Sequence, residues 1–155
     1  EWLPAYFGAY ALIMKAYTLT DMKEVDPTCD KADELIAMAE SIAPQNAEIT
    51  TLKAMVLTAR MRADGSRGMT MGPKATQYCH QALQQMPAGN PRAMMQMAQM
   101  LYYTPAAFGG GTEAGINMLK KSVDAFDSFV PASALHPNWG KAYTVNLLAQ
   151  WTAKQ

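Results

Sequence analysis

The cysteines and histidines are the residues of this chain with the greatest intrinsic reactivity, and there are two of each. Cys79 and His80 are adjacent, and neighbouring residues on a helix point about 100° apart, so their side chains do not face each other. We expect Cys79 to act as a small core hydrophobe. Cys29 precedes a predicted helix and is the more accessible thiol. Enzymatic use of Cys29 or His80 is therefore our third functional hypothesis.

The sequence contains no motif typical of a metal, phosphate or cofactor site. His136 lies alone in a turn, and two isolated histidines without nearby carboxylates do not make a metal site. The glycines at 109–111 lack the Lys-Ser/Thr that follows a phosphate-binding loop, so we expect them to supply positive φ or a close backbone approach. A Cys29–Cys79 disulfide stays open, since it needs Cα atoms within about 7 Å. We predict no catalytic residue, no metal and no cofactor.

Composition excludes several classes of partner. The chain has 155 residues, half of them hydrophobic, and 13 Lys and Arg balance 13 Asp and Glu. A chain of this length can bury a core as one domain. Its zero net charge gives no field that favours nucleic acid. No apolar stretch approaches the roughly 20 residues of a membrane span.

The pattern of helix formers and breakers predicts an all-α fold. Ala, Met, Leu, Gln and Lys dominate, and hairpin-turn dipeptides are lacking. Asn46 and Asn90 are good N-caps, and Pro44 and Pro87 follow helix ends. We predict about seven helices, over residues 3–20, 30–42, 47–63, 73–86, 91–103, 112–129 and 138–153.

The chain repeats itself with a period of 43 to 44 residues. Pro44, Pro87 and Pro131 close successive even-numbered helices at this spacing, and Asn46 and Asn90 open the next helices 44 residues apart. Small residues recur in the same frame. They lie eight residues after Asn46 and Asn90 in the odd helices and seven residues apart in the even ones: Ala54, Ala98, Ala32, Ala39, Ala75 and Ala82. Such positions let two helices cross closely.

This frame resembles the tetratricopeptide repeat, which stacks helical hairpins into a solenoid. The family's unit is 34 residues long, about nine fewer than here. The surplus falls between the two helices of each pair, at residues 20–29, 63–72 and 104–111, which we expect to form elongated loops. The interpretation is a single domain over 1–155, with units at 1–44, 45–87 and 88–131 and a C-terminal helix at 138–153.

A closer likeness rests on short motifs that occur in order along the chain: Glu1-Trp2-Leu3-Pro4, Ser66-Arg67-Gly68-Met69, Asn90-Pro91-Arg92-Ala93, Phe108-Gly109-Gly110-Gly111 and His136-Pro137-Asn138-Trp139-Gly140. Together they resemble a group of exported tetratricopeptide-like proteins of Bacteroidetes-type bacteria, which have no assigned activity. The resemblance implies a periplasmic or envelope location, a removed signal peptide and a further helix before Trp2.

The same resemblance implies a binding groove. In the tetratricopeptide family, one face of each first helix lines the concave surface, and the matching positions here are Arg92, Met95, Gln99, Tyr102, Glu48, Thr51, Met55 and Thr58. A surface of this mixture suits a peptide or helix. The main functional hypothesis is therefore a non-enzymatic interaction module that binds a protein or peptide in this groove or along the loop edge.

The alternative hypothesis is a small-ligand carrier with a pocket lined by Tyr102, Tyr103 and Phe108. Arg67 is a further candidate, because a guanidinium pairs well with a ligand carboxylate. The competing interpretation, which we favour, is that Arg67 pairs with an acid of the chain itself. Asp26 and Asp64 are the first partners to examine.

Overall fold

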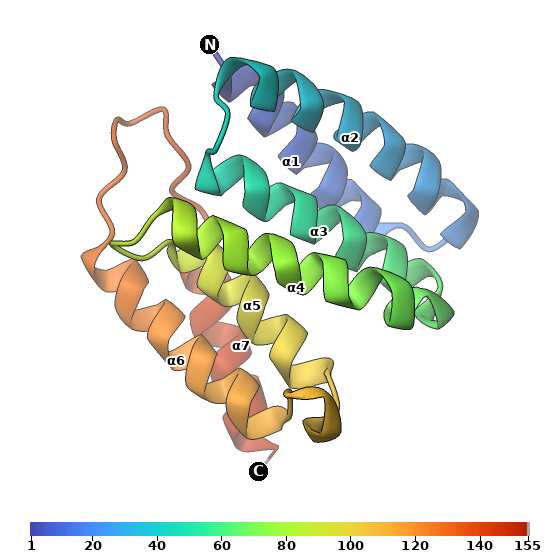
Figure 1. The fold of residues 1–155 in the computed structure, drawn as a ribbon, viewed down its shortest axis with the longest axis vertical. Helices are drawn as coiled ribbons and strands as arrows, with labels where there is room; N and C mark the ends of the chain where they lie inside the picture. The colour runs from blue at the N-terminus through green and yellow to red at the C-terminus, as the bar shows by residue number, and fades with distance from the viewer. Residues whose placement is uncertain (155) are drawn as a thin grey trace. The chain divides into compact units, whose positions relative to one another are not determined.

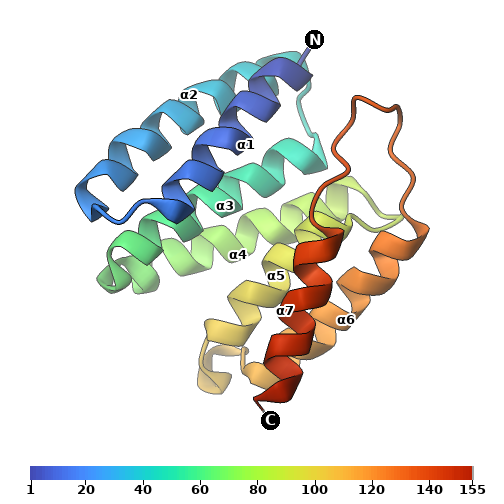
Figure 2. The same cartoon turned by 180° about the vertical axis from the view of Figure 1, so that it is seen from behind.

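The computed structural model describes residues 1–154, and this part of the chain is all-α (Figures 1 and 2). It contains seven α-helices, three short 3-10 turns and no strand, which confirms the predicted fold class. The helices are α1 (Leu3–Thr18), α2 (Val25–Ile42), α3 (Ala47–Ala63), α4 (Gly68–Gln85), α5 (Pro91–Tyr103), α6 (Thr112–Ser128) and α7 (Lys141–Ala153). Within residues 1–154, no helix has the length and apolar character required to cross a membrane.

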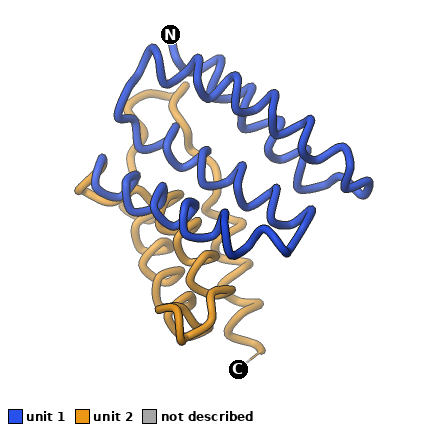
Figure 3. The backbone as a smooth tube through the Cα atoms, turned by 45° about the vertical axis from the view of Figure 1, so that its right-hand side comes forward, with its two compact units in different colours: residues 1–85 blue, residues 86–155 orange. Residues whose placement is uncertain are grey.

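The helices group into two compact units, which Figure 3 distinguishes by colour. Unit 1 comprises residues 1–85 with α1 to α4, and unit 2 comprises residues 86–155 with α5 to α7. The prediction of a single domain built of three units plus a last helix stays a prediction.

Unit 1 consists of two helical hairpins, α1 with α2 and α3 with α4, and α1 and α2 both pack on α3. The buried face of α1 carries Tyr6, Ala9, Ile13 and Ala16, all without exposed surface. Their spacing of three and four residues places them on one stripe of the helix. Small residues on this stripe allow the neighbouring helices to approach closely.

The starts of α2 and α4 differ from the prediction. Both helices begin five residues earlier than expected, because each grows out of a 3-10 turn (Met22–Glu24 and Gly65–Arg67). Asp21 accepts a hydrogen bond from the backbone N–H of Lys23, and Asp64 accepts one from that of Ser66. Such side-chain caps nucleate a turn. Most of the residues predicted as long loops at 20–29 and 63–72 therefore extend the helices.

The asparagines and prolines that recur every 43 to 44 residues lie at the starts and after the ends of helices. Asn46 and Asn90 accept hydrogen bonds from backbone N–H groups of the first turns of α3 and α5, as predicted. Pro44, Pro87 and Pro131 each follow the end of an even-numbered helix within three residues. The residues that recur with this spacing thus mark helix boundaries.

Unit 2 consists of the α5–α6 hairpin, with α7 packed on α6. Gly115 makes the close crossing of α5 and α6 possible: a Cβ atom there would lie 2.6 Å from Cβ of Tyr102 and 2.7 Å from its Cα. The core of the unit contains Met95, Ala98, Ile116, Leu119 and Trp151. Trp151 comes from α7, so this helix completes the core of the hairpin.

Candidate functional site

Four aromatic side chains gather where α5 ends and α7 runs past it, and we call them the aromatic surface: Tyr102, Tyr103, Tyr143 and Trp151. The rings of Tyr102 and Trp151 are stacked, with centroids 3.8 Å apart and an interplanar angle of 14°. The ring of Tyr103 is nearly perpendicular to both, at 77° and 89°, with centroid distances of 5.1 and 6.4 Å. Offset and edge-to-face pairs of this kind hold rings in fixed orientations.

The aromatic surface has a buried base and an exposed top. Trp151 is 2% exposed, whereas Tyr103 is 74% and Tyr143 53% exposed. The hydroxyl of Tyr143 donates a hydrogen bond to Oε1 of Gln99 on α5, at 3.3 Å. Burial raises the pKa of Tyr143, and the neighbouring Tyr103 adds to the rise, so this phenol is neutral at pH 7. The result is an uncharged, largely apolar platform open to solvent.

The helix register explains how α7 contributes to this surface. Tyr143, Leu147 and Trp151 are spaced by four residues, so they lie along one stripe of α7. Leu147 is partly buried against the core of unit 2. Tyr102 and Tyr103 were predicted from the sequence to contact a ligand, whereas Tyr143 and Trp151 were not. The four-residue spacing of Tyr143, Leu147 and Trp151 places them on one face of a helix but does not indicate what that face packs against.

The charge of the two units differs in sign. Residues 86–155 contain five Lys and Arg against three Asp and Glu, which gives unit 2 a net charge of +2. Residues 1–85 contain eight against ten, which gives unit 1 a net charge of −2. The unit that carries the aromatic surface is therefore the one that attracts an anionic ligand.

Phe108, the third residue predicted to line a pocket, is 70% exposed in the 3-10 turn Ala106–Phe108. This turn belongs to the glycine-rich connection between α5 and α6. Gly109 and Gly111 have φ of 84° and 122°, and a Cβ on Gly110 would lie 2.2 Å from the carbonyl oxygen of Thr104. The expectation of positive φ and close approach is confirmed. The part of Phe108 in ligand binding stays a prediction.

Arg92 is buried rather than exposed in a groove. Its guanidinium carbon lies 4.4 Å from the ring centroid of Phe129, 5.7 Å from that of Trp139 and 5.9 Å from that of Phe126. One of its terminal nitrogens donates a hydrogen bond to the carbonyl of Trp139 at 3.3 Å. Arg92 thus anchors the connection between α6 and α7 to α5, which explains its burial. It does not line an open groove.

Four other predicted groove residues of α3 and α5 are buried as well, and Thr58, Gln99 and Tyr102 are partly buried. Met95 belongs to the core of unit 2. In unit 1, Tyr6 donates a hydrogen bond to the Glu48 carboxylate at 3.4 Å, and Thr51 donates one to the carbonyl of Ala47 at 2.7 Å. Met55 is buried beside them. Helix packing occupies these side chains, so they do not form the open peptide-binding face that the resemblance implied. Of this set, Tyr102 belongs to the aromatic surface, and Gln99 contacts it by accepting the hydrogen bond from Tyr143.

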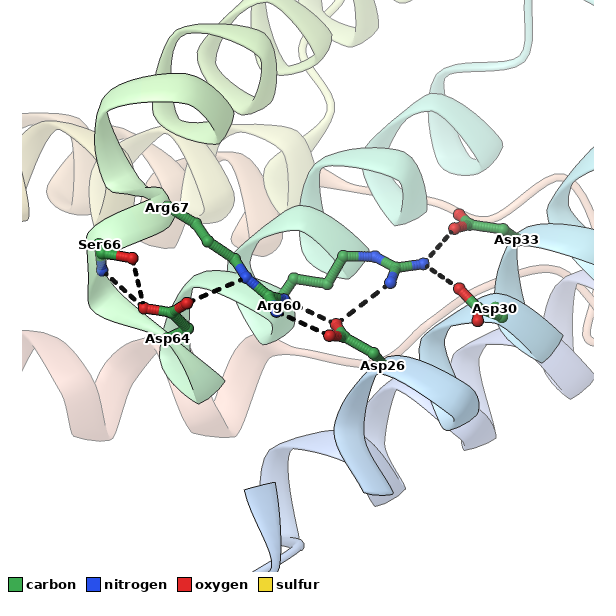
Figure 4. A network of polar contacts seen from close by, with 7 residues as sticks. All are labelled: Asp26, Asp30, Asp33, Arg60, Asp64, Ser66 and Arg67. Carbon is green, nitrogen blue, oxygen red and sulfur yellow. Dashed lines mark hydrogen bonds and ion pairs between the residues drawn. The ribbon is translucent and has the colours of Figure 1, made fainter. Parts of the chain in front are cut away.

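Arg67 pairs within the chain, as favoured by the sequence analysis (Figure 4). Its two terminal nitrogens donate to the two carboxylate oxygens of Asp26, each at 2.8 Å, and its Nε lies 3.4 Å from Asp64. Arg60 contacts Asp26 as well and also binds Asp30 and Asp33. Hydrogen bonds from Arg67 are the largest cause that lowers the pKa of Asp26. The network ties the start of α2 to α3 and to the turn before α4.

The thiols and imidazoles do not form a reactive centre. Both cysteines are free and buried, which excludes the Cys29–Cys79 disulfide in this structure. Desolvation raises the pKa of Cys29 to about 11 and that of Cys79 to about 12, so neither is a thiolate at neutral pH. His136 shares a hydrogen bond with Ser133 at 2.8 Å, and His80 is exposed. In the described part of the chain, no group of three or more potential metal ligands occurs.

A small pocket in unit 1 is less suited to a large ligand. It has a volume of about 200 Å³ and is lined by residues of α2, α3 and α4, among them Lys53, Lys74 and Tyr78. Lys53 is already paired with Glu40. Pockets for drug-sized ligands measure about 300–1,000 Å³. The aromatic surface of unit 2 is therefore the better candidate for a molecule of that size or larger.

Comparison with solved structures finds the HusA haemophore from Porphyromonas gingivalis. It is 33% identical in sequence, and the match covers 100% of this chain and 76% of that one, with a TM-score of 0.88. No protein-family model and no curated protein matches the chain.

This match corrects two predictions. The identification as a tetratricopeptide-repeat protein is wrong, since the similar structure is a haemophore and no repeat-family model matches. The expected protein or peptide partner is wrong for the same reason, and the alternative of a small-ligand carrier is the better supported one. A haemophore is a carrier, which agrees with the prediction of a non-enzymatic protein.

Proposed function

Because this chain belongs to the family of the HusA haemophore, we propose that it is a haem carrier that binds its cargo on the aromatic surface of unit 2. The observation that supports this most directly is the 33% identity over the whole chain at a TM-score of 0.88. The structure adds an uncharged, partly exposed cluster of tyrosine rings, of which Tyr102 and Tyr103 contact the buried Trp151.

The chemistry of haem fits this platform. Haem is a planar, mostly apolar macrocycle with two carboxylates at one edge. Its faces suit stacking on aromatic rings, and its carboxylates suit a unit of positive net charge. Tyrosine also occurs as a haem-iron ligand. On the aromatic surface, Tyr103 and Tyr143 are exposed enough for ring contact or for a bond through the phenol oxygen.

The experiment separates these two contributions. Haem is titrated into the protein and binding is followed by the Soret absorbance. Tyr143→Phe keeps the ring and removes the oxygen, whereas Tyr143→Leu removes the ring. With stacking as the main contribution, we expect Tyr143→Phe to bind like the parent protein and Tyr143→Leu to bind about 2- to 12-fold more weakly, from about 0.5–1.5 kcal/mol per aromatic contact. Tyr103→Leu should behave like Tyr143→Leu.

Phe7→Leu is the matched control, because Phe7 is an exposed aromatic residue of α1 in unit 1. It should leave haem affinity unchanged. Two results would contradict the proposal: absence of saturable haem binding by the parent protein, or parent-like affinity in the Tyr103→Leu/Tyr143→Leu double variant. Equal weakening by Tyr143→Phe and Tyr143→Leu would instead assign the contact to the phenol oxygen.

We also propose the envelope location that the sequence analysis expected, since a haem carrier collects its cargo outside the cytoplasm. Immunodetection in separated periplasmic, membrane and cytoplasmic fractions of the source bacterium tests this. Recovery of the protein mainly in the cytoplasm would refute it.

A further inference from the structure

One cation lies in line with the aromatic surface. Lys154 follows Trp151 by three residues, and Trp151 follows Leu147 and Tyr143 by four and eight. The backbone of Lys154 is still right-handed helical, with φ −89° and ψ −6°, so the stripe continues onto this residue. Its side chain is exposed. A positive charge therefore lies at the C-terminal end of the α7 stripe that carries Tyr143 and Trp151.

The other cations of unit 2 are placed differently. Arg92 is buried among aromatic rings, and Lys141 pairs with Asp127 at 2.8 Å. Lys141 precedes Tyr143 by two residues, which puts it on another side of α7. Lys120 and Lys121 are exposed on α6, outside the stripe of α7. Lys154 is thus the cation that shares the helix face of the aromatic surface.

We infer that Lys154 holds the carboxylate edge of the bound macrocycle, so that the ligand lies on Tyr103 and Tyr143 with its carboxylates toward the C-terminal turn of α7. This inference rests on the proposed haem-carrying function. It adds an orientation for the ligand and a selectivity: a porphyrin with free carboxylates binds better than the same porphyrin with esterified carboxylates.

The test compares two ligands that share one ring system. Protoporphyrin IX carries both carboxylates, and its dimethyl ester carries none. Affinities are measured by quenching of tryptophan fluorescence for the parent protein and for Lys154→Gln, Lys154→Arg and Lys121→Gln. Lys121→Gln removes an equal charge from unit 2 away from the stripe, so it controls for net charge.

We expect Lys154→Gln to weaken binding of the free acid about two- to fivefold, as for an exposed ion pair, and to leave binding of the ester unchanged. Lys154→Arg should restore the affinity, and added salt should reduce the difference between the two ligands. Equal weakening for both ligands, or no weakening for either, would overturn the inference while leaving haem binding intact. If the parent protein binds neither metal-free ligand, the inference fails, and the haem titration with the Tyr143 and Tyr103 variants decides the proposed function separately.

Discussion

The crossing of α5 and α6 at Gly115 allows a quantitative test of the fold of unit 2. A Cβ atom at this position would lie 2.6, 2.7 and 2.8 Å from Cβ, Cα and N of Tyr102. Two of these are backbone atoms, so a change of side-chain rotamer cannot relieve the clash. Gly115→Ala must therefore push the two helices apart or shift Tyr102, which is stacked on Trp151.

Two opposing terms set the size of the effect. Insertion of a methyl group into a packed site costs about 1–3 kcal/mol, and the involvement of backbone atoms places this site near the upper limit. Replacement of Gly by Ala inside a helix gains about 1 kcal/mol of helix propensity. The net loss of stability is about 1–2 kcal/mol. For a chain of this length, it corresponds to a fall in Tm of about 2–8 °C.

Gly68→Ala is the matched control for this measurement. Gly68 begins α4 with helical backbone angles, φ −54° and ψ −40°, and a Cβ atom there would have nothing within 4 Å. The propensity term then acts without a clash and should leave the protein at least as stable as the parent, with a gain of up to about 1 kcal/mol. Urea unfolding followed by circular dichroism measures both variants. If Gly115→Ala proves as stable as Gly68→Ala, the two helices are not in close contact, and the described support of Tyr102 is incorrect.

Two further predictions concern unit 1. Asp26→Asn should lower stability at pH 7 by about 1 kcal/mol or less, since the carboxylate is partly exposed. Because the pKa of Asp26 is lowered in the folded state, its contribution is complete above about pH 4 and disappears as the pH falls through the folded pKa, so the variant and the parent protein should converge in acid. If the variant is still less stable than the parent protein at pH 2, the loss of stability does not come from the charge of Asp26. In the native protein, Cys29 and Cys79 should react with a thiol reagent far more slowly at pH 7.5 than after denaturation, because both are buried and their pKa values are about 11 and 12. Labelling at the rate of an exposed thiol would refute the described environment of the thiols.

The sequence predicted the helices well where local signals act alone. The side chains of Asn46 and Asn90 cap α3 and α5 where expected, since an Asn side chain can accept the free N–H groups of a first turn. The starts of α2 and α4 were missed because Asp21 and Asp64 each begin a 3-10 turn that continues directly into the helix. Pro73 was predicted to start the fourth helix, but it lies inside α4.

The candidate site was only half predictable. Tyr102 and Tyr103 end a helix that the sequence delimits clearly, so they stood out as candidate ligand contacts. Tyr143 and Trp151 join them only because α7 returns to pack on α6, and no local pattern reports this return. The groove prediction failed at Arg92 for a similar reason. Its side chain is enclosed by Phe129 and Trp139, which follow it by 37 and 47 residues.

The enclosure of Arg92 has a consequence for mutational scanning. About eleven residues of helix, or roughly 16 Å, separate it from Tyr103. Yet Arg92 fastens the segment that leads into α7, and α7 supplies Tyr143 and Trp151. Under the proposed function, an alanine scan scored by haem binding would therefore register Arg92 as a hit although the residue lies outside the aromatic surface. Only a parallel readout of whether the last helix is docked would separate such hits from true contacts.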